Sequence, residues 1–134
     1  MPGLNLADAR RMLDAGLAEA DAIGQPMNVA IVDAGGHLLA FARQDGAIRA
    51  SIDIAQRKAA TAILMEAPTA ALMPLVQPGA ELYGLEQTAG GMVVFGGGIP
   101  VHRDGELVGA VGVSAGSAEQ DVRVAEAAAA ALKA

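Results

Sequence analysis

The chain has 134 residues, of which 53% are hydrophobic but only 2% aromatic, and its formal net charge at pH 7 is −6. An acidic chain with few aromatic side chains lacks the basic stripe and the stacking platforms that nucleic-acid binding needs, and anionic membranes do not attract it. The absence of cysteine excludes disulfides, zinc–thiolate sites, iron–sulfur clusters and covalent haem attachment.

A chain of this length forms one domain with a buried core, and we take 1–134 as that single domain. With no Trp, one Tyr and two Phe, the core must consist mainly of Ala, Val, Leu, Ile and Met. Small side chains bury little area each, so we expect homo-oligomer contacts to add stability. The first residues lack the apolar region of a signal peptide, and no apolar run approaches the roughly 18 residues of a membrane span. We therefore expect a cytoplasmic protein.

The first predicted element is a helix over residues 6–23. Asn5 is a typical N-cap residue, and Asp8 follows it three positions later. Apolar residues then recur at intervals of three and four, which places them in one stripe that faces the core. Gly24 is typical of a helix end, and Pro26 prevents continuation.

Two strands and a second helix follow. Residues 27–32 and 37–43 read as strands, and the turn at 33–36 predicts that they form an antiparallel hairpin. The second of these strands carries apolar residues on both faces, so we expect both faces to be covered. A second helix is expected from about residue 48 or 51 to Met65.

A segment rich in proline and glycine comes next. Pro68 ends the second helix, and Thr69 is expected to cap a short helix that extends to Leu75. Residues 77–91 form a long loop that contains Leu82 and Tyr83. Apolar residues in such a loop indicate that it packs, either on the domain or on a neighbouring subunit.

The stretch 90–121 predicts three strands, a hairpin turn and the last helix. The strands are expected at 92–95, 99–102 and 107–113. Asp104-Gly105 is a hairpin dipeptide, because a type I′ turn needs positive φ at both central residues. Ser117 precedes Gln120 by the spacing of a capping box, so the last helix is expected to begin at Ser117. The whole order predicts an α+β fold with an antiparallel sheet of about five strands and helices on both faces.

The junction at 114–117 leads from a buried strand through small residues into a helix. The first N–H groups of a helix have no intrahelical partner and lie at the positive end of its dipole, so such a junction can hold a carboxylate or phosphate. The alternative is that Ser117 satisfies these donors and the connection only caps itself.

Residues 112–116 match the pattern G-x-S-x-G and lie between a strand and a helix, as a serine nucleophile elbow does. In an α/β-hydrolase the acid and the histidine follow the serine, whereas both histidines of this chain, His37 and His102, precede Ser114. The chain is also short for that fold. We therefore do not favour a serine nucleophile at Ser114.

Several stretches together resemble one known family. They are VAIVDAGGHLLAFARQDGA (29–47), SIDIAQRKAATA (51–62), APT (67–69), PGAELYGL (78–85), GGMVVFGGGIPV (90–101) and DGELVGAVGVSAGSAEQD (104–121). In this order they resemble the GlcG/HbpS-type haem-binding family, which is similar to the C-terminal domain of PduO-type cobalamin adenosyltransferases. The resemblance implies a profilin-like α-β-α sandwich, compact homo-oligomers and a small-molecule role, often in catabolism.

The resemblance implies haem as a cofactor, since some members of the family bind it. In some relatives a histidine on the first helix is involved in haem ligation, and here residues 6–23 contain none. The two histidines that are present, His37 and His102, are expected to be strand-surface residues. Other members of the family act on small carboxylate or imine metabolites.

Three charged residues, Arg43, Asp45 and Lys58, match positions of the family pattern. An Arg can grip a carboxylate through two hydrogen bonds, and a Lys can hold an anion or act as a base when desolvated. We predict catalytic roles for this trio. The alternative is that Asp45 caps a turn while Arg43 and Lys58 form ion pairs or face solvent.

The predicted ligand-binding residues belong to the glycine-rich stretch and the start of the last helix. They are Gly97, Gly98, Ser114, Gly116, Ser117 and Asp121. The run of three glycines at 96–98 either lets a ligand contact the backbone or forms a bulge where a strand bends. Asp121 either complements the helix dipole or serves the site, as its match to a Gln-Asp pair of the family implies.

The sequence thus favours a cytoplasmic homo-oligomer that binds a small ligand, either haem or a small organic acid, and we predict an anionic ligand held by Arg43 and the N–H groups around 114–117. A second hypothesis is an enzyme that acts on a small carboxylate or imine metabolite, as a hydrolytic deaminase or an isomerase. In it Arg43 grips the acid, and Lys58 or Asp45 moves protons. A third is a structural or regulatory partner without a ligand. No metal site is expected.

Overall fold

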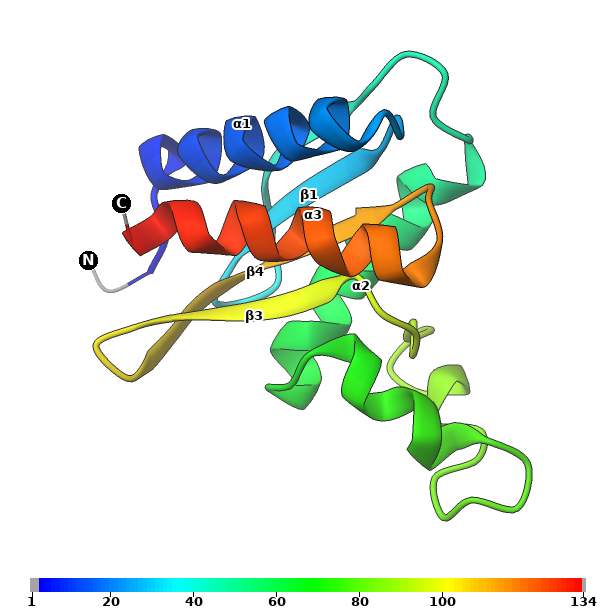
Figure 1. The fold of residues 1–134 in the computed structure, drawn as a ribbon. Helices are drawn as coiled ribbons and strands as arrows, with labels where there is room; N and C mark the ends of the chain where they lie inside the picture. The colour runs from blue at the N-terminus through cyan, green and yellow to red at the C-terminus, as the bar shows by residue number, and fades with distance from the viewer. Residues whose placement is uncertain (1–2, 134) are drawn as a thin grey trace.

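The computed structural model describes residues 3–133, in which one antiparallel sheet lies between two layers of helices (Figure 1). Helices α1 (Leu6–Ile23) and α3 (Ala118–Ala130) pack against each other and cover one face of the sheet. Helix α2 (Ala50–Met65) covers the other face. The predicted arrangement of helices on both faces is confirmed.

The sheet has four strands, in the order β2-β1-β4-β3. Their bounds are β1 Asn28–Asp33, β2 Leu38–Arg43, β3 Gly98–Arg103 and β4 Glu106–Ser114. Both predicted hairpins form, and β1 and β4 pair in the centre with Asn28 opposite Ser114. The expectation of about five strands is wrong by one.

The missing strand is the apolar run 92–95. Its first two amides hydrogen-bond outside any strand ladder: Met92 N donates to Glu86 O (2.9 Å), and Val93 N donates to the Thr61 hydroxyl of α2 (3.1 Å). The chain joins the sheet only at Gly98, where β3 begins. Apolar residues alone therefore did not distinguish a buried extended segment from a strand.

The predicted helix ends are confirmed in detail. Asn5 and Asp8 form a reciprocal capping box at the start of α1, and Ser117 and Gln120 form one at the start of α3. Gly24 ends α1 in the left-handed conformation with φ 68°. These local patterns fix where both helices of one layer begin.

Two further local predictions have different outcomes. Asp104 and Gly105 have φ values of 53° and 81°, as a type I′ turn requires. Thr69 does not cap the short helix η1 (Thr69–Val76), whose N-cap is Pro68. Its buried hydroxyl instead accepts a hydrogen bond from Gly98 N (2.8 Å), so it fastens η1 to the start of β3.

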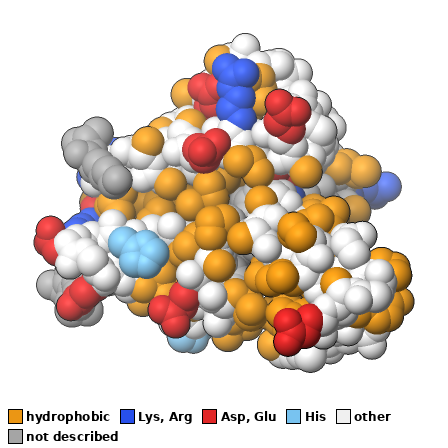
Figure 2. Space-filling model, turned by 60° about the horizontal axis from the view of Figure 1, so that its bottom comes forward, with side chains coloured by type: hydrophobic (Ala, Val, Ile, Leu, Met, Phe, Trp, Pro, Cys, Tyr) orange, Lys and Arg blue, Asp and Glu red, His pale blue; other side chains and the backbone are white. Residues whose placement is uncertain are grey.

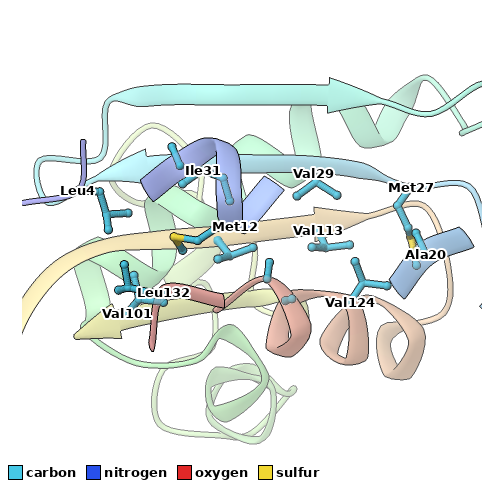
Figure 3. Packing of buried hydrophobic residues seen from close by; sticks show 14 of the residues in the cluster. Leu4, Met12, Ala20, Met27, Val29, Ile31, Val101, Val113, Val124 and Leu132 are labelled. Atoms are coloured by element: carbon cyan, nitrogen blue, oxygen red, sulfur yellow. The ribbon is translucent and has the colours of Figure 1, made fainter. Parts of the chain in front are cut away.

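The main core lies between the sheet and the α1–α3 layer (Figure 3). Its larger side chains are fully or almost fully buried, and they come from α1, the strands and α3. Those of Met12, Met27, Val29, Ile31, Val113 and Val124 are among them. Burial of this apolar area supplies most of the driving force for folding.

Between α2 and the sheet the packing is closer and the side chains are smaller. Ala55, Ala59 and Ala62 face the sheet and are completely buried. A Cβ atom at Gly112 of β4 would overlap the carbonyl oxygen of Ala55. Main chain therefore contacts main chain across this layer, which a glycine at position 112 makes possible.

Residues 66–91 extend from the end of α2 beyond the sheet (Figure 1). They contain η1 and a second short helix, η2 (Leu85–Gln87), and a small separate cluster of Leu72, Val76 and Val94 holds them to the domain. Within residues 3–133 no single helix is long and apolar enough to cross a membrane, although α2 and η1, bent by 82° at their junction, together have the length and composition.

Candidate functional site

Lys58 is the largest fully buried side chain of the described residues. It lies on the sheet-facing side of α2, next to Ala59. Its Nζ donates to the main-chain oxygen of Val113 (2.8 Å) and to Oδ2 of Asp121 (2.9 Å). A lysine is almost never fully buried unless it is paired, and here both partners are present.

The ion pair between Lys58 and Asp121 joins helices that belong to opposite layers, since α2 and α3 cover different faces of the sheet. The side chain of Lys58 reaches α3 past the start of β3. A Cβ atom at Gly97 would lie 2.7 Å from Lys58 Nζ and 3.0 Å from its Cδ. The absence of a side chain at Gly97 therefore leaves the space that the Lys58 side chain occupies.

Asp121 has both carboxylate oxygens engaged. Oδ2 accepts from Lys58, and Oδ1 accepts from the main-chain N–H of Gly116 (3.0 Å). Because Asp121 lies in the first turn of α3, its negative charge also faces the positive end of the helix dipole. One buried carboxylate thus connects the strand-to-helix turn, α3 and α2.

Phe95 covers the lysine. Its ring centroid is 4.9 Å from Lys58 Nζ, within the range of a cation–π contact. The Phe95 side chain is not fully buried, since the residue is 38% exposed. The ammonium group is therefore shielded from solvent by a single aromatic ring on one side.

Burial shifts the pKa of each member of the pair toward its neutral form. Desolvation lowers the pKa of Lys58, and the hydrogen bond and charge of Asp121 oppose this only in part. Desolvation likewise raises the pKa of Asp121, against the opposing effects of Lys58 and of the Gly116 N–H group. The two shifts narrow the gap between the pKa values, so transfer of a proton from Lys58 to Asp121 costs less free energy than between the same two groups in water.

Two adjoining cavities lie on the outer side of Phe95. The first has a volume of about 1020 Å³ and the second about 510 Å³. Both are lined by Ala70, Val122 and Glu126, so they form one depression between η1, β3 and α3, which we call the α3 groove. Figure 2 shows the side of the molecule that carries η1 and β3, where hydrophobic side chains gather between scattered acidic ones.

Three of the predicted ligand-binding residues line the α3 groove, since Ser117 lines its first cavity and Gly97 and Gly98 line its second. The others lie around the lysine. Gly97 and Gly98 pack against Lys58, and a Cβ at Gly98 would overlap the lysine's main-chain oxygen. The buried Ser114 hydroxyl donates to Ser51 Oγ (2.9 Å). Asp121 is the partner of Lys58.

Two of the amides that the sequence assigned to an anion are already engaged. Gly116 N donates to Asp121 Oδ1, and Ser117 N donates to Oε1 of Gln120 (2.9 Å). The structure therefore agrees with the alternative that this junction caps itself. The side chains of Gln120 and Asp121, in the first turn of α3, supply the acceptor oxygen atoms.

The trio Arg43, Asp45 and Lys58 is not brought together. Arg43 and Asp45 are exposed and line a separate cavity of about 550 Å³ at the C-terminal end of α1, together with Asp21 and Gln25. Lys58 is enclosed behind Phe95. Catalytic roles for the three residues stay a prediction, and joint action on one ligand would need a rearrangement.

The histidines also lie apart from one another. His37 is in the β1–β2 turn, with its side chain 83% exposed and its Nδ1 3.4 Å from Asp33 Oδ1. His102, on β3, lines the second cavity of the α3 groove. Within residues 3–133 no group of three or more His, Cys, Asp or Glu side chains is placed to hold a metal ion.

Sequence reasoning singled out Ser117, Gly97 and Gly98 of the α3 groove but missed other residues that line it. Phe95 was assigned to a strand, and Ala70 and Met73 to an unremarkable short helix, yet all three line the first cavity. One signal was available: Phe95 is one of two phenylalanines, and three glycines follow it. A glycine run leaves room for other groups to approach the main chain, so an aromatic residue beside it is a candidate wall of a binding site.

Comparison with known proteins places these features in a family. The model of the family described as "Haem degrading protein HbpS-like" matches residues 4–130. A 15.0 kDa protein from the dhaT–dhaS intergenic region of Citrobacter freundii is 44% identical over 124 residues, which are 92% of this chain and 87% of that protein. The corrinoid adenosyltransferase PduO of Salmonella typhimurium is 42% identical over 130 residues, which are 96% of this chain but only 39% of that enzyme.

A solved structure agrees with these matches. The crystal structure of a PduOC:Heme complex superimposes with a TM-score of 0.92 and 42% identity over 96% of this chain and 94% of that one. The family model covers almost all of the described residues, and the sequence identities lie well above the level at which only a fold is shared. The chain therefore belongs to the HbpS-like family.

Proposed function

We propose that the protein binds a small ligand in the α3 groove and that this ligand is haem. The observation that carries the proposal is the groove itself: a cavity of about 1020 Å³, continued by a second one, with Phe95, Met73 and Val122 in its walls. Cofactor sites are concave, mostly apolar and of about this size. The haem complex of the related PduOC supports the choice of ligand.

The residues of the groove fit the demands of haem. Apolar walls suit the faces of a porphyrin, and the two cavities contain one candidate axial ligand each, Met73 in the first and His102 in the second. At the rim, Arg123 donates through Nε to Glu19 (2.7 Å) and has further N–H groups for a carboxylate. When bound, haem would supply a redox-active iron.

A titration with haemin tests this proposal. Ala70 is exposed and lines both cavities, so Ala70→Glu puts a bulky negative charge into the groove with little effect on folding. Its neighbour Ala71 is exposed, belongs to the same short helix and lines neither cavity, which makes Ala71→Glu the matched control. We expect a Soret shift that Ala70→Glu weakens and Ala71→Glu leaves as it is. Equal binding by both variants would contradict the proposal.

Substitutions of the candidate axial ligands test which residue would bind the haem iron. Because the lining of the first and larger cavity contains Met73 and no histidine, we expect the Soret shift to survive His37→Ala and His102→Ala individually and to change in Met73→Ala. If His102→Ala abolishes the shift, the histidine is the axial ligand and the second cavity holds the iron.

We further propose that the protein is a homo-oligomer. Residues 69–91 expose several large apolar side chains, among them Leu75 (42% exposed) and Tyr83 (67% exposed). Exposed apolar side chains gathered on one projecting segment are typical of a subunit contact. Light scattering at micromolar concentration is expected to give a mass above that of the 13.4 kDa chain, and a monomer mass would contradict the proposal.

A further inference from the structure

The amine of Lys58 is held by two hydrogen bonds, whereas an ammonium group has three donors. Val113 O and Asp121 Oδ2 take two of them, and the ring of Phe95 lies over the nitrogen at 4.9 Å. The third N–H group has no hydrogen-bond partner among the described residues, and the ring of Phe95 is the aromatic group in contact with the nitrogen.

Phe95 adjoins both this amine and the α3 groove. Its ring contacts the lysine, and Phe95 also lines the first cavity, whose lining does not include Lys58. Gly96 and Gly97 follow it, and Gly97 has φ 131°, which only glycine adopts readily. Because Phe95 contacts both the amine and the first cavity, we expect a rotation of its side chain to bring Nζ into contact with that cavity.

We propose that Lys58 reacts with small carbonyl compounds, aldehydes or ketones, that enter the first cavity, and forms an imine with them. A buried lysine in an apolar setting is a good nucleophile because its neutral form is favoured. Asp121 lies at hydrogen-bond distance and can receive and return the proton. This activity goes beyond haem binding and does not require haem.

The step balances within the pair and the carbonyl compound. Oδ2 of Asp121 takes a proton from the ammonium group, and the neutral amine attacks the carbonyl carbon. The nitrogen then passes a proton to the former carbonyl oxygen, which gives a carbinolamine. Protonation of its hydroxyl group by Asp121 releases water and leaves a C=N bond. The protonated imine keeps the one positive charge of Lys58 opposite the carboxylate, and no oxidant or reductant takes part.

The walls of the first cavity near Phe95 indicate compounds of a few carbons. Ala70, Val122 and Gly96 offer small or apolar contacts there, and the rim carries Glu119, Glu126 and Arg123. The rim holds charges of both signs, so it selects neither for nor against a carboxylate. An uncharged aldehyde and a 2-oxo acid both carry the required carbonyl group. Butanal and pyruvate are suitable probes of these two types.

The chain makes the test simple, because it contains only two lysines, at positions 58 and 133. The folded protein is incubated with butanal or pyruvate in the presence of sodium cyanoborohydride, which fixes an imine as a stable amine, and the adduct is located by peptide mass spectrometry. We expect Lys58 to be modified faster than Lys133, since desolvation lowers the pKa of Lys58 and so favours its neutral, nucleophilic amine. Lys133→Arg should leave the modification of Lys58 unchanged.

Two variants separate the proposed path from chance reactivity. Phe95→Ala removes the cover over Nζ and is expected to speed the modification of Lys58, whereas Leu64→Ala, at an exposed apolar position of α2, should not. Modification by butanal alone or by pyruvate alone assigns the carbonyl class. Modification of Lys133 and the α-amino group with Lys58 left intact, in a protein whose circular dichroism shows it folded, would overturn the proposal.

Discussion

The two faces of the sheet are built on different principles. Toward α1 and α3 the sheet presents Val29, Ile31 and Val113, which meet methionine, valine and alanine side chains. Toward α2 it presents Ala30, Gly112 and Ser114, which meet alanines, a serine and a lysine. One face is an ordinary apolar core, and the other is a close contact of main chains with polar groups inside it.

This difference separates stability from chemistry. The α1–α3 face buries large apolar side chains, and burial of apolar area is the dominant favourable term in folding. On the α2 face hydrogen bonds from buried side chains fix the position of the helix, such as those of Lys58 to Val113 O and of Asn28 Nδ2 to Ile48 O (3.2 Å). A buried polar group that loses its hydrogen-bond partner costs free energy, so these bonds favour one position of the helix. The buried Lys58 belongs to this second face, whereas its partner Asp121 and much of the α3 groove belong to α3.

The largest effect is expected from breaking the buried pair. Asp121→Leu leaves the ammonium of Lys58 without its charged partner, at 0% side-chain exposure, and we expect a loss of about 3–5 kcal/mol in the free energy of unfolding. Adding Lys58→Met removes the orphaned charge, and the double variant is expected to regain most of that loss. Urea denaturation of the three proteins measures it, and a double variant no more stable than Asp121→Leu would show that the charge was not the cause.

A smaller but still large effect should follow from one added methyl group on the α2 face. In Gly112→Ala the new Cβ overlaps Ala55 O, a main-chain atom in mid-helix that cannot turn aside. We expect a destabilisation of about 3 kcal/mol, at the upper end of the usual range for overpacking. Gly79→Ala is the control, because nothing lies within 4 Å of its Cβ and only its φ of 87° causes strain. Thermal unfolding of both variants gives the comparison.

The apolar face was largely predictable from the sequence, and the α2 face was not. Capping boxes at Asn5 and Ser117 and the hairpin dipeptide at Asp104 act within a few residues of themselves, so their patterns are local. The apolar periodicity likewise predicted α1, but its predicted stripe was only partly right, since Ala9 and Ala20 are buried and Leu6 is 49% exposed. The fifth strand was predicted wrongly because an apolar run says that a segment is buried but not what its amides bond to.

The site depends on contacts between distant residues. Lys58 and Asp121 were each singled out, but they are 63 residues apart, and their pairing depends on the gap that Gly97 leaves. Phe95 covers Lys58 Nζ beside this same gap, so its role also depends on the contact between distant residues. Arg43 and Lys58 were expected to act together because both matched the family pattern, yet a sequence does not tell that one is exposed and the other enclosed.

Removal of a methyl group from the apolar face tests the other side of the comparison. Ile31 is completely buried in the main core, and Ile31→Val is expected to cost about 1 kcal/mol, as is typical where neighbours relax little. The same number of atoms thus changes stability by roughly a third as much as Gly112→Ala. Equal losses in guanidinium titrations of the two variants would mean that the two faces do not differ in tolerance.

The smallest effect concerns a polar group at the rim of the apolar face, and it depends on pH. Asp8 accepts from Asn5 N (3.2 Å) and from Arg103 of β3 (3.1 Å), and the pKa of its carboxyl is lowered chiefly by the first of these bonds. Since Asp8 has a lower pKa in the folded protein than its usual 3.8, it adds stability above that pH, and this stability is lost as the pH falls through the folded-state value.

Asp8→Asn removes the charge and keeps an acceptor oxygen, so we expect it to cost only about 1 kcal/mol at pH 7, because the partner Arg103 is partly exposed and water screens the attraction. Urea titrations between pH 7 and pH 2.5 should show the difference between the two proteins shrinking toward the acid end, as the wild-type carboxyl takes up a proton. A difference that stays constant over this range would assign the loss to packing at the capping box. A loss as large as that of Asp121→Leu would contradict the view that charge matters most where it is enclosed, under α2.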